Sequence, residues 1–233
     1  MSWRITILEQ PRVTYCGDQG LLLEAEGDLE LATQERIWAL NEQVLEWGGV
    51  LDTQPGMNSL LVLLDPDAHD VTECRDRLLG AWKEVRSTAR KGKLLEVGVV
   101  YGGEGGCDLA DVARYHRVDR ADIVKLHANA EYTIFAPGVS PGFGYLFGLD
   151  RRLFIPRRDV PVMRKVGSIV SIAGAQAILG SPRKPNGADL GPTGWYVIGR
   201  ALDVPVPFDL ARDPMSLVSL GDRIRFRVER IEK

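Results

Sequence analysis

The sequence of 233 residues predicts an α+β protein, in which a ferredoxin-like α/β domain precedes a second domain of short β-strands. In the first hundred residues, apolar runs and amphipathic stretches follow the order β-α-β-β-α-β, which is typical of an antiparallel sheet with both helices on one face. The composition then changes, because residues 1–101 hold 12 glycines and prolines whereas residues 102–233 hold 26. Short apolar runs between such turn residues indicate a barrel or a sandwich.

The first domain is predicted from its hydrophobic periodicity. Ile37, Leu40 and Val44 recur at helical spacing, and Gly48 and Gly49 end that helix. A second stripe of the same kind begins at Val71. The expected elements are strands at 3–8 and 20–25, a helix at 29–47, strands at 50–53 and 59–64, a helix at 67–88 and a strand at 94–101.

The second domain is predicted to begin near Lys93, which gives an N-terminal domain over residues 1–92 and a β-rich domain over residues 93–233. Two short helices are expected first, at 108–115 and 120–129. The strand candidates that follow are the apolar runs at 131–135, 168–173, 194–199, 204–208 and 223–229. The proline-rich segment 181–192 is expected to be a surface insertion or a lid.

Composition excludes several classes of protein. The net charge of −3 and a pI of about 5.7 do not favour binding to nucleic acid or to an anionic membrane. No apolar run approaches the ~18 residues of a membrane span, and the first residues lack the pattern of a signal peptide. Cys16, Cys74 and Cys107 form no CxxC motif and no disulfide framework, which favours a cytoplasmic protein. No spacing among cysteines and histidines predicts a metal site.

The string Gly138-Val139-Ser140-Pro141-Gly142 has the G-x-S-x-G form of a serine-hydrolase nucleophile elbow. The elbow uses the backbone N–H after the serine for its oxyanion hole, and Pro141 has none. All three histidines also precede Ser140, whereas the hydrolase order places the triad histidine after it. We therefore interpret the stretch as a turn-rich segment. The spacing of the following glycines also misses the G-x-G-x-x-G of a dinucleotide loop by one residue.

Other candidate residues leave alternatives open. His127, near the end of the second short helix, is either a structural residue, as a satisfied polar group or a helix C-cap, or a catalytic residue. Residues 150–165 carry six basic and two acidic side chains, which form either a solvated face or a site for a carboxylate or phosphate. The helix pair at 108–129 resembles a helix-turn-helix, whose second helix should carry basic or amide side chains along its length in a DNA reader. Here that helix offers Lys125, His127 and Asn129 close to the acidic Asp122 and Glu131, so a structural helix pair is favoured over DNA binding.

A series of ordered sequence blocks runs along nearly the whole chain. The blocks are Gly17-Asp18, Tyr101-Gly102-Gly103, Cys107-Asp108-Leu109, Val112-Ala113, Leu126-His127 with Tyr132, Pro141-Gly142-Phe143, Tyr145-Leu146, Pro156-Arg157, Arg164, Gly167-Ser168, Ile172-Ala173-Gly174, Gln176, Gly194-Trp195, Ile198-Gly199-Arg200, and Gly221-Asp222 with Ile224 and Phe226. In this order, the blocks resemble the allophanate hydrolase subunit 1 family, which includes the B subunit of bacterial 5-oxoprolinase and the inhibitor of sporulation histidine kinase A.

The resemblance implies a cyclophilin-like β-barrel as the second domain and a role as one component of an ATP-dependent hydrolase. In 5-oxoprolinase, such a complex opens the lactam of 5-oxoproline to glutamate. The implied partners are a homologous second subunit of the allophanate hydrolase subunit 2 type and a barrel-type lactam-utilisation protein. The resemblance also implies catalytic residues, namely His127, Arg164 and Gln176, and substrate-binding residues, namely Phe143, Tyr145, Arg157 and Trp195.

Two other functions are compatible with the same resemblance. One is inhibition of a histidine kinase, and the other is a carboxyltransferase component of a urea-type system, which would require biotin. This chain shows no biotin-attachment or ATP-grasp signal, so either ATP or biotin chemistry needs a partner. Departures from the usual family pattern surround the expected cleft, namely Val139-Ser140, Ile178-Leu179-Gly180, Pro192-Thr193 and Ala201.

Overall fold

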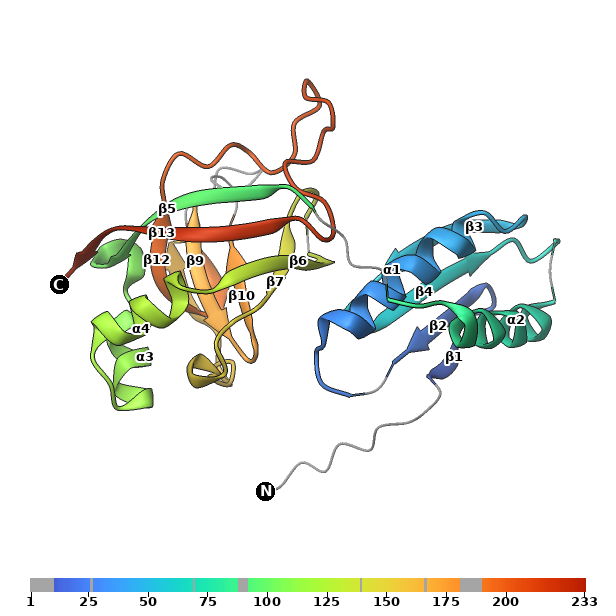
Figure 1. The fold of residues 1–233 in the computed structure, drawn as a ribbon, viewed down its shortest axis with the longest axis horizontal. Helices are drawn as coiled ribbons and strands as arrows, with labels where there is room; N and C mark the ends of the chain where they lie inside the picture. Colours follow the sequence, from blue (N-terminus) through green and yellow to red (C-terminus); the bar gives the residue numbers. More distant parts are fainter. Residues whose placement is uncertain are drawn as a thin grey trace. The chain divides into compact units, whose positions relative to one another are not determined.

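The chain forms two compact units, residues 1–90 and residues 91–233 (Figure 1). The computed structural model describes residues 11–25, 27–68, 70–87, 92–138, 140–165, 167–180 and 190–233. The strand expected at 3–8 and most of the segment 181–192 lie outside these residues. No helix in the described ranges is long and apolar enough to cross a membrane.

In the part of the first unit that the structure describes, a four-stranded antiparallel sheet packs with two helices. The strands stand in the order β1-β2-β4-β3. The elements are β1 (Arg12–Cys16), β2 (Gly20–Glu24), α1 (Leu31–Leu45), β3 (Val50–Pro55), β4 (Ser59–Leu64) and α2 (Val71–Glu84).

Alternation along the strands builds the core of this unit. Leu21 and Leu23 of β2 face the same side as Leu60 and Val62 of β4, and all four are fully or almost fully buried. Both helices pack their apolar stripes onto that side. At the start of α2, the Asp70 carboxylate accepts hydrogen bonds from the backbone of Thr72 and Glu73 and so caps the helix. The predicted helices and the strands at 20–25, 50–53 and 59–64 are thus confirmed in type.

The path of the chain through this sheet differs from the predicted order in one respect. In a ferredoxin-like sheet, the strand after the second helix completes the sheet beside the first strand. Here that edge position is held by β1, which precedes β2, and the strand expected at 94–101 belongs to the second unit instead.

The second unit is a closed barrel of seven strands in the order β10-β7-β6-β13-β5-β12-β9. The long β13 runs parallel to β5, and the other strand pairs of the barrel are antiparallel. The strands are β5 (Leu94–Gly102), β6 (Glu131–Pro137), β7 (Gly144–Phe147), β9 (Ile169–Ala173), β10 (Gln176–Leu179), β12 (Tyr196–Ala201) and β13 (Arg223–Glu232).

Helices and a hairpin flank the barrel. The 3-10 helix η1 (Glu104–Gly106), then α3 (Leu109–His116) and α4 (Arg120–Ala128) connect β5 to β6, and α3 and α4 contribute to the barrel core. The helix pair is therefore packed as a structural element. A further 3-10 helix, η2 (Arg151–Leu153), precedes a two-stranded hairpin of β8 (Val162–Lys165) and β11 (Leu190–Thr193).

The segment with the G-x-S-x-G string is a turn between two strands. Gly138 N–H donates to the Phe143 carbonyl, Phe143 N–H donates to the Ser140 carbonyl, and Gly142 has a φ of 72°. β7 follows instead of a helix, so the predicted turn is confirmed. The prediction of a strand at 204–208 is wrong. In this segment only Phe208 makes a β-bridge, an isolated one to Ser216.

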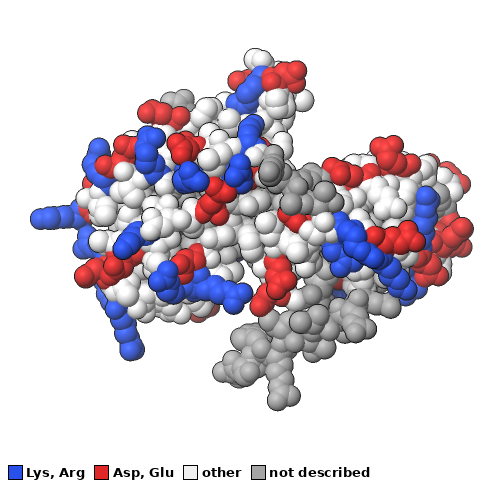
Figure 2. Space-filling model, viewed as in Figure 1, with Lys and Arg blue, Asp and Glu red and all other residues white. Residues whose placement is uncertain are grey.

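The predicted α+β fold class, with a barrel after the α/β unit, is confirmed. On the face drawn in Figure 2, basic and acidic side chains are interspersed, as expected for a chain with a net charge of −3. A cavity in the wall of the barrel unit gathers several charged side chains in one place.

Candidate functional site

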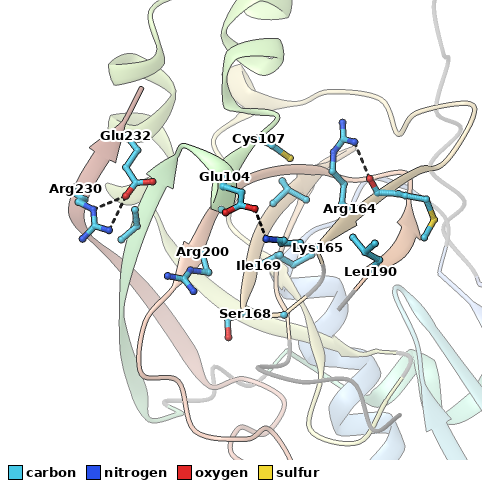
Figure 3. Close-up of a pocket in the computed structure, with 15 residues that line it drawn as sticks. Glu104, Cys107, Arg164, Lys165, Ser168, Ile169, Leu190, Arg200, Arg230 and Glu232 are labelled. Atoms are coloured by element: carbon cyan, nitrogen blue, oxygen red, sulfur yellow. Dashed lines mark hydrogen bonds and ion pairs between the residues drawn. The ribbon is translucent and has the colours of Figure 1, made fainter. Parts of the chain in front are cut away.

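The barrel unit carries a cavity of about 590 Å³ on the outer side of its wall (Figure 3). Its lining comes from β8 and β11 of the hairpin, from β5, β9, β12 and β13 of the barrel, and from η1. This volume is within the ~300–1,000 Å³ typical of sites for small molecules. Among the described residues, six charged side chains line it: Glu104, Arg164, Lys165, Arg200, Arg230 and Glu232.

A buried carboxylate holds the hairpin in place. Asp108 is completely buried and accepts hydrogen bonds from Arg158 Nη2 at 2.9 Å and from Arg164 Nη2 at 2.7 Å. Its other oxygen accepts the backbone N–H of Val197 at 2.9 Å. The hydrogen bond to Asp108 raises the pKa of Arg164 above its usual value. Asp108 therefore ties the start of α3, strand β12 and the hairpin to one point.

The remaining charges of the cavity are mostly paired. Lys165 donates to Glu104, and this hydrogen bond lowers the pKa of the Glu104 carboxyl. Arg230 donates to Glu232 at 2.8 Å. Arg200 has no hydrogen-bond or ion-pair partner among the described residues, and Figure 3 shows it between these two pairs. With four basic and two acidic side chains, the lining favours an anion.

An aromatic cluster contains the four predicted substrate-binding residues. Tyr145 stacks on Trp195 with ring centroids 6.1 Å apart and contacts Phe143 edge to face at 5.7 Å. The guanidinium carbon of Arg157 is 4.8 Å from the centroid of the Trp195 ring, which is a cation–π distance. The structure therefore brings Phe143, Tyr145, Arg157 and Trp195 together.

Strand register places this cluster next to the cavity. Ser171 of β9 is paired on one side with Val197, which lines the cavity, and on the other with Ile178, which packs in the cluster. Directly paired residues share one face of a sheet. Ser171 is itself buried, and its Oγ has no hydrogen-bond partner among the described residues. Gln176, also predicted as catalytic, is nearly buried at the start of β10.

His127 occupies a different environment. It is fully buried in the barrel core, where it stacks on Phe226 with centroids 4.8 Å apart and shares a 2.8 Å hydrogen bond between Nδ1 and the Tyr101 hydroxyl. Its Nε2 has no hydrogen-bond partner among the described residues. Burial lowers the pKa of His127 to about 3, so the ring is neutral at pH 7.

The predicted site residues thus lie in three places. Arg164 is in the cavity lining, the aromatic residues and Arg157 form the adjacent cluster, and His127 lies in the core. The sequence did not single out Asp108, Lys165 or Arg200. Asp108-Leu109 and Gly199-Arg200 were among the motif blocks, but residue type and spacing gave neither of them a role. Within the described ranges, no group of three acidic, histidine or cysteine side chains is placed to hold a metal ion.

The chain thus belongs to the class of α+β proteins in which an α/β unit precedes a closed barrel, and its barrel unit carries a charged cavity. The model of the carboxyltransferase domain, subdomain C and D, matches residues 11–218, and the chain belongs to this family. The resemblance drawn from the motif blocks is confirmed.

Within the family, the chain is a homologue of the 5-oxoprolinase B subunit. It is 33% identical to the B subunit of 5-oxoprolinase from Escherichia coli O157:H7, over 94% of this chain and 96% of the relative. The corresponding B subunit from Haemophilus influenzae is also 33% identical, over 85% of this chain and 89% of the relative.

Solved structures share the fold. The protein TTHA0988 matches 90% of this chain with a TM-score of 0.71 and 28% identity, and this chain spans only 39% of that protein. The urea amidolyase of K. lactis matches 94% of this chain with a TM-score of 0.70. Its 19% identity supports the fold alone, and this chain spans 15% of its length.

Proposed function

We propose that the chain is the B subunit of an ATP-dependent 5-oxoprolinase complex, which adds water across the lactam C–N bond of 5-oxoproline and releases glutamate. The observation that carries this is the 33% identity to the 5-oxoprolinase B subunit over 96% of that protein. Such coverage includes both units of this chain. The free cysteines, Cys16, Cys74 and Cys107, agree with work in the cytoplasm.

The proposed complex has two further components, a homologous second subunit and a barrel-type lactam-utilisation protein. ATP is proposed as a cosubstrate of the assembled complex, where it would supply the free energy for lactam opening. No atom of this chain is assigned to ATP by this proposal.

Roles for the candidate residues follow from where they lie. We assign the aromatic cluster, with Arg157, to the substrate-facing wall, because strand register places the cluster beside the cavity. Gln176 is assigned to the same wall, because it pairs with Ala173 of that cluster. Arg164 faces the cavity and is assigned to substrate orientation. His127 is assigned to the packing of the barrel core and not to substrate contact, because its ring is fully buried.

The test is reconstitution of the three proteins and measurement of glutamate formed from 5-oxoproline and ATP. We expect turnover by the full set and loss of turnover when this chain is left out. A complex that assembles, as checked by size-exclusion chromatography, yet forms no glutamate would overturn the proposed substrate. Trp195→Ala should lower turnover, because it removes the ring on which Tyr145 stacks and over which the Arg157 guanidinium lies. Trp47→Ala in the first unit is the matched control, because Arg77 lies over that ring in the same way.

A further inference from the structure

Arg200 differs from the other basic side chains of the barrel-wall cavity. It projects from β12, is exposed, and lines the cavity. Arg164, Lys165 and Arg230 each contact a carboxylate. Among the described residues, Arg200 makes no hydrogen bond and no ion pair at contact distance, and its longer-range attraction to Glu104 only helps to lower the pKa of that carboxyl. The cavity therefore has one guanidinium whose hydrogen-bond donors are unused.

From this arrangement we infer that the cavity is an oxyanion-binding site, with Arg200 as its anchoring cation. A planar guanidinium matches the paired oxygens of a carboxylate or a phosphate, and charge-assisted hydrogen bonds of this kind are the strong ones. The lining has four basic and two acidic side chains among the described residues, and this excess of positive charge attracts an anion to the concave site.

Two neighbours complete the site. Lys165 is 62% exposed and its partner Glu104 is 82% exposed, so this surface ion pair is weak and the ammonium is free to turn to a ligand. Ser168 lines the same cavity and adopts a left-handed φ of 53°, a conformation that non-glycine residues adopt mainly at turns and functional sites. Its hydroxyl has no hydrogen-bond partner among the described residues and is a further donor for the anion.

The sequence of η1 fits a site built around Arg200. A Cβ added at Gly105 would lie 2.9 Å from the Cβ of Arg200, which is closer than real Cβ contacts. Glycine at this position lets the stem of Arg200 lie directly along η1. A side chain there would push the guanidinium away from its present place.

The oxyanion has two possible sources, namely the carboxylate of 5-oxoproline and the phosphates of ATP. The choice of these two molecules rests on the proposed function, whereas the anion site itself rests only on the geometry. A neutral analogue, the amide of 5-oxoproline, separates the sources because it keeps the lactam ring and lacks the carboxylate.

The experiment is a ligand-detected NMR titration of the full chain with 5-oxoproline, with its amide and with MgATP. We expect wild-type protein to bind 5-oxoproline or MgATP, and a carboxylate source predicts loss of binding for the amide. Arg200→Gln should lower the affinity for the anion at least about 10-fold. Gly105→Ala should weaken it in the same direction while keeping the charge.

Arg227→Gln is the matched control, because Arg227 is also an exposed arginine of the barrel but lies outside the cavity and is paired with Glu229. Its affinity should equal that of wild type. The inference is overturned if wild type binds neither anion, or if Arg200→Gln binds as tightly as wild type. If the chain binds the anion through Arg200 but the assembled complex forms no glutamate, the proposed function fails and the anion site stands. If the chain binds no anion and the complex with Arg200→Gln has normal turnover and KM, the anion site fails and the proposed function stands.

Discussion

Replacing Asp108 by alanine is expected to cause the largest loss of stability of any single charged-residue change in the barrel unit. The carboxylate is completely buried, and it accepts hydrogen bonds from Arg158, Arg164 and the backbone of Val197. Removing one partner of a buried ion pair leaves the remaining charges uncompensated, at a cost of about 3–5 kcal/mol. The two arginine side chains are 20% and 28% exposed and regain some hydration, so we expect about 3 kcal/mol.

The measurement is chemical denaturation of the full chain, with hydrogen exchange at β5 and β12 amides to assign the transition to the barrel. Asp108→Asn should lower the free energy of unfolding by less than Asp108→Ala does, because an amide oxygen still accepts the Val197 N–H. Asp111→Ala is the matched control: its side chain is 42% exposed, and surface changes of this kind stay within about 0.5 kcal/mol. Equal stability of the Asp108 and Asp111 variants would refute a central role for the buried carboxylate.

The sequence was a good guide to which segments are helices and strands, and a poorer guide to which strands pair. The strand at 94–101 is correctly predicted, yet its partners in the barrel are β12 and β13, which lie far later in the chain. Alternation shows that Val97 and Val99 face one side, but it does not encode the neighbouring strand. Strands β7, β8, β10 and β11 have only four residues each, too few for a clear period of two.

The candidate site shows the same limit. Phe143, Tyr145 and Trp195 were selected by resemblance and do form one cluster, because they share the outer side of the barrel. Asp108 was missed because its arginine partners lie 50 and 56 residues away, and an aspartate before a helix is ordinarily interpreted as a cap. Here Asp108 makes no capping hydrogen bond. Only the folded barrel shows that, of the basic residues in 150–165, Asp108 binds Arg158 and Arg164.

Acidification is expected to destabilise the barrel through His127. Burial lowers the pKa of His127 in the folded chain to about 3, whereas an unfolded histidine has a pKa of about 6.5. The unfolded chain therefore takes up a proton that the folded chain does not, and stability falls as the pH drops from 6.5 towards 3. Between pH 7.5 and pH 5 the expected loss from this residue is about 2 kcal/mol. That loss continues at lower pH, where protonation of carboxylates adds to it.

His127→Gln isolates this effect, because the amide does not titrate and can still share a hydrogen bond with Tyr101. We expect denaturation at pH 7.5 and pH 5 to show a smaller pH-dependent loss in the variant, by about 2 kcal/mol, whatever its stability at pH 7.5. His116→Gln is the control, since burial also lowers the pKa of His116 but the ring is only partly buried. An unchanged pH dependence in His127→Gln would show that the ring is protonated within the folded barrel. A charged imidazolium would then need an anionic partner that the aromatic surroundings, Tyr101, Tyr132 and Phe226, do not supply.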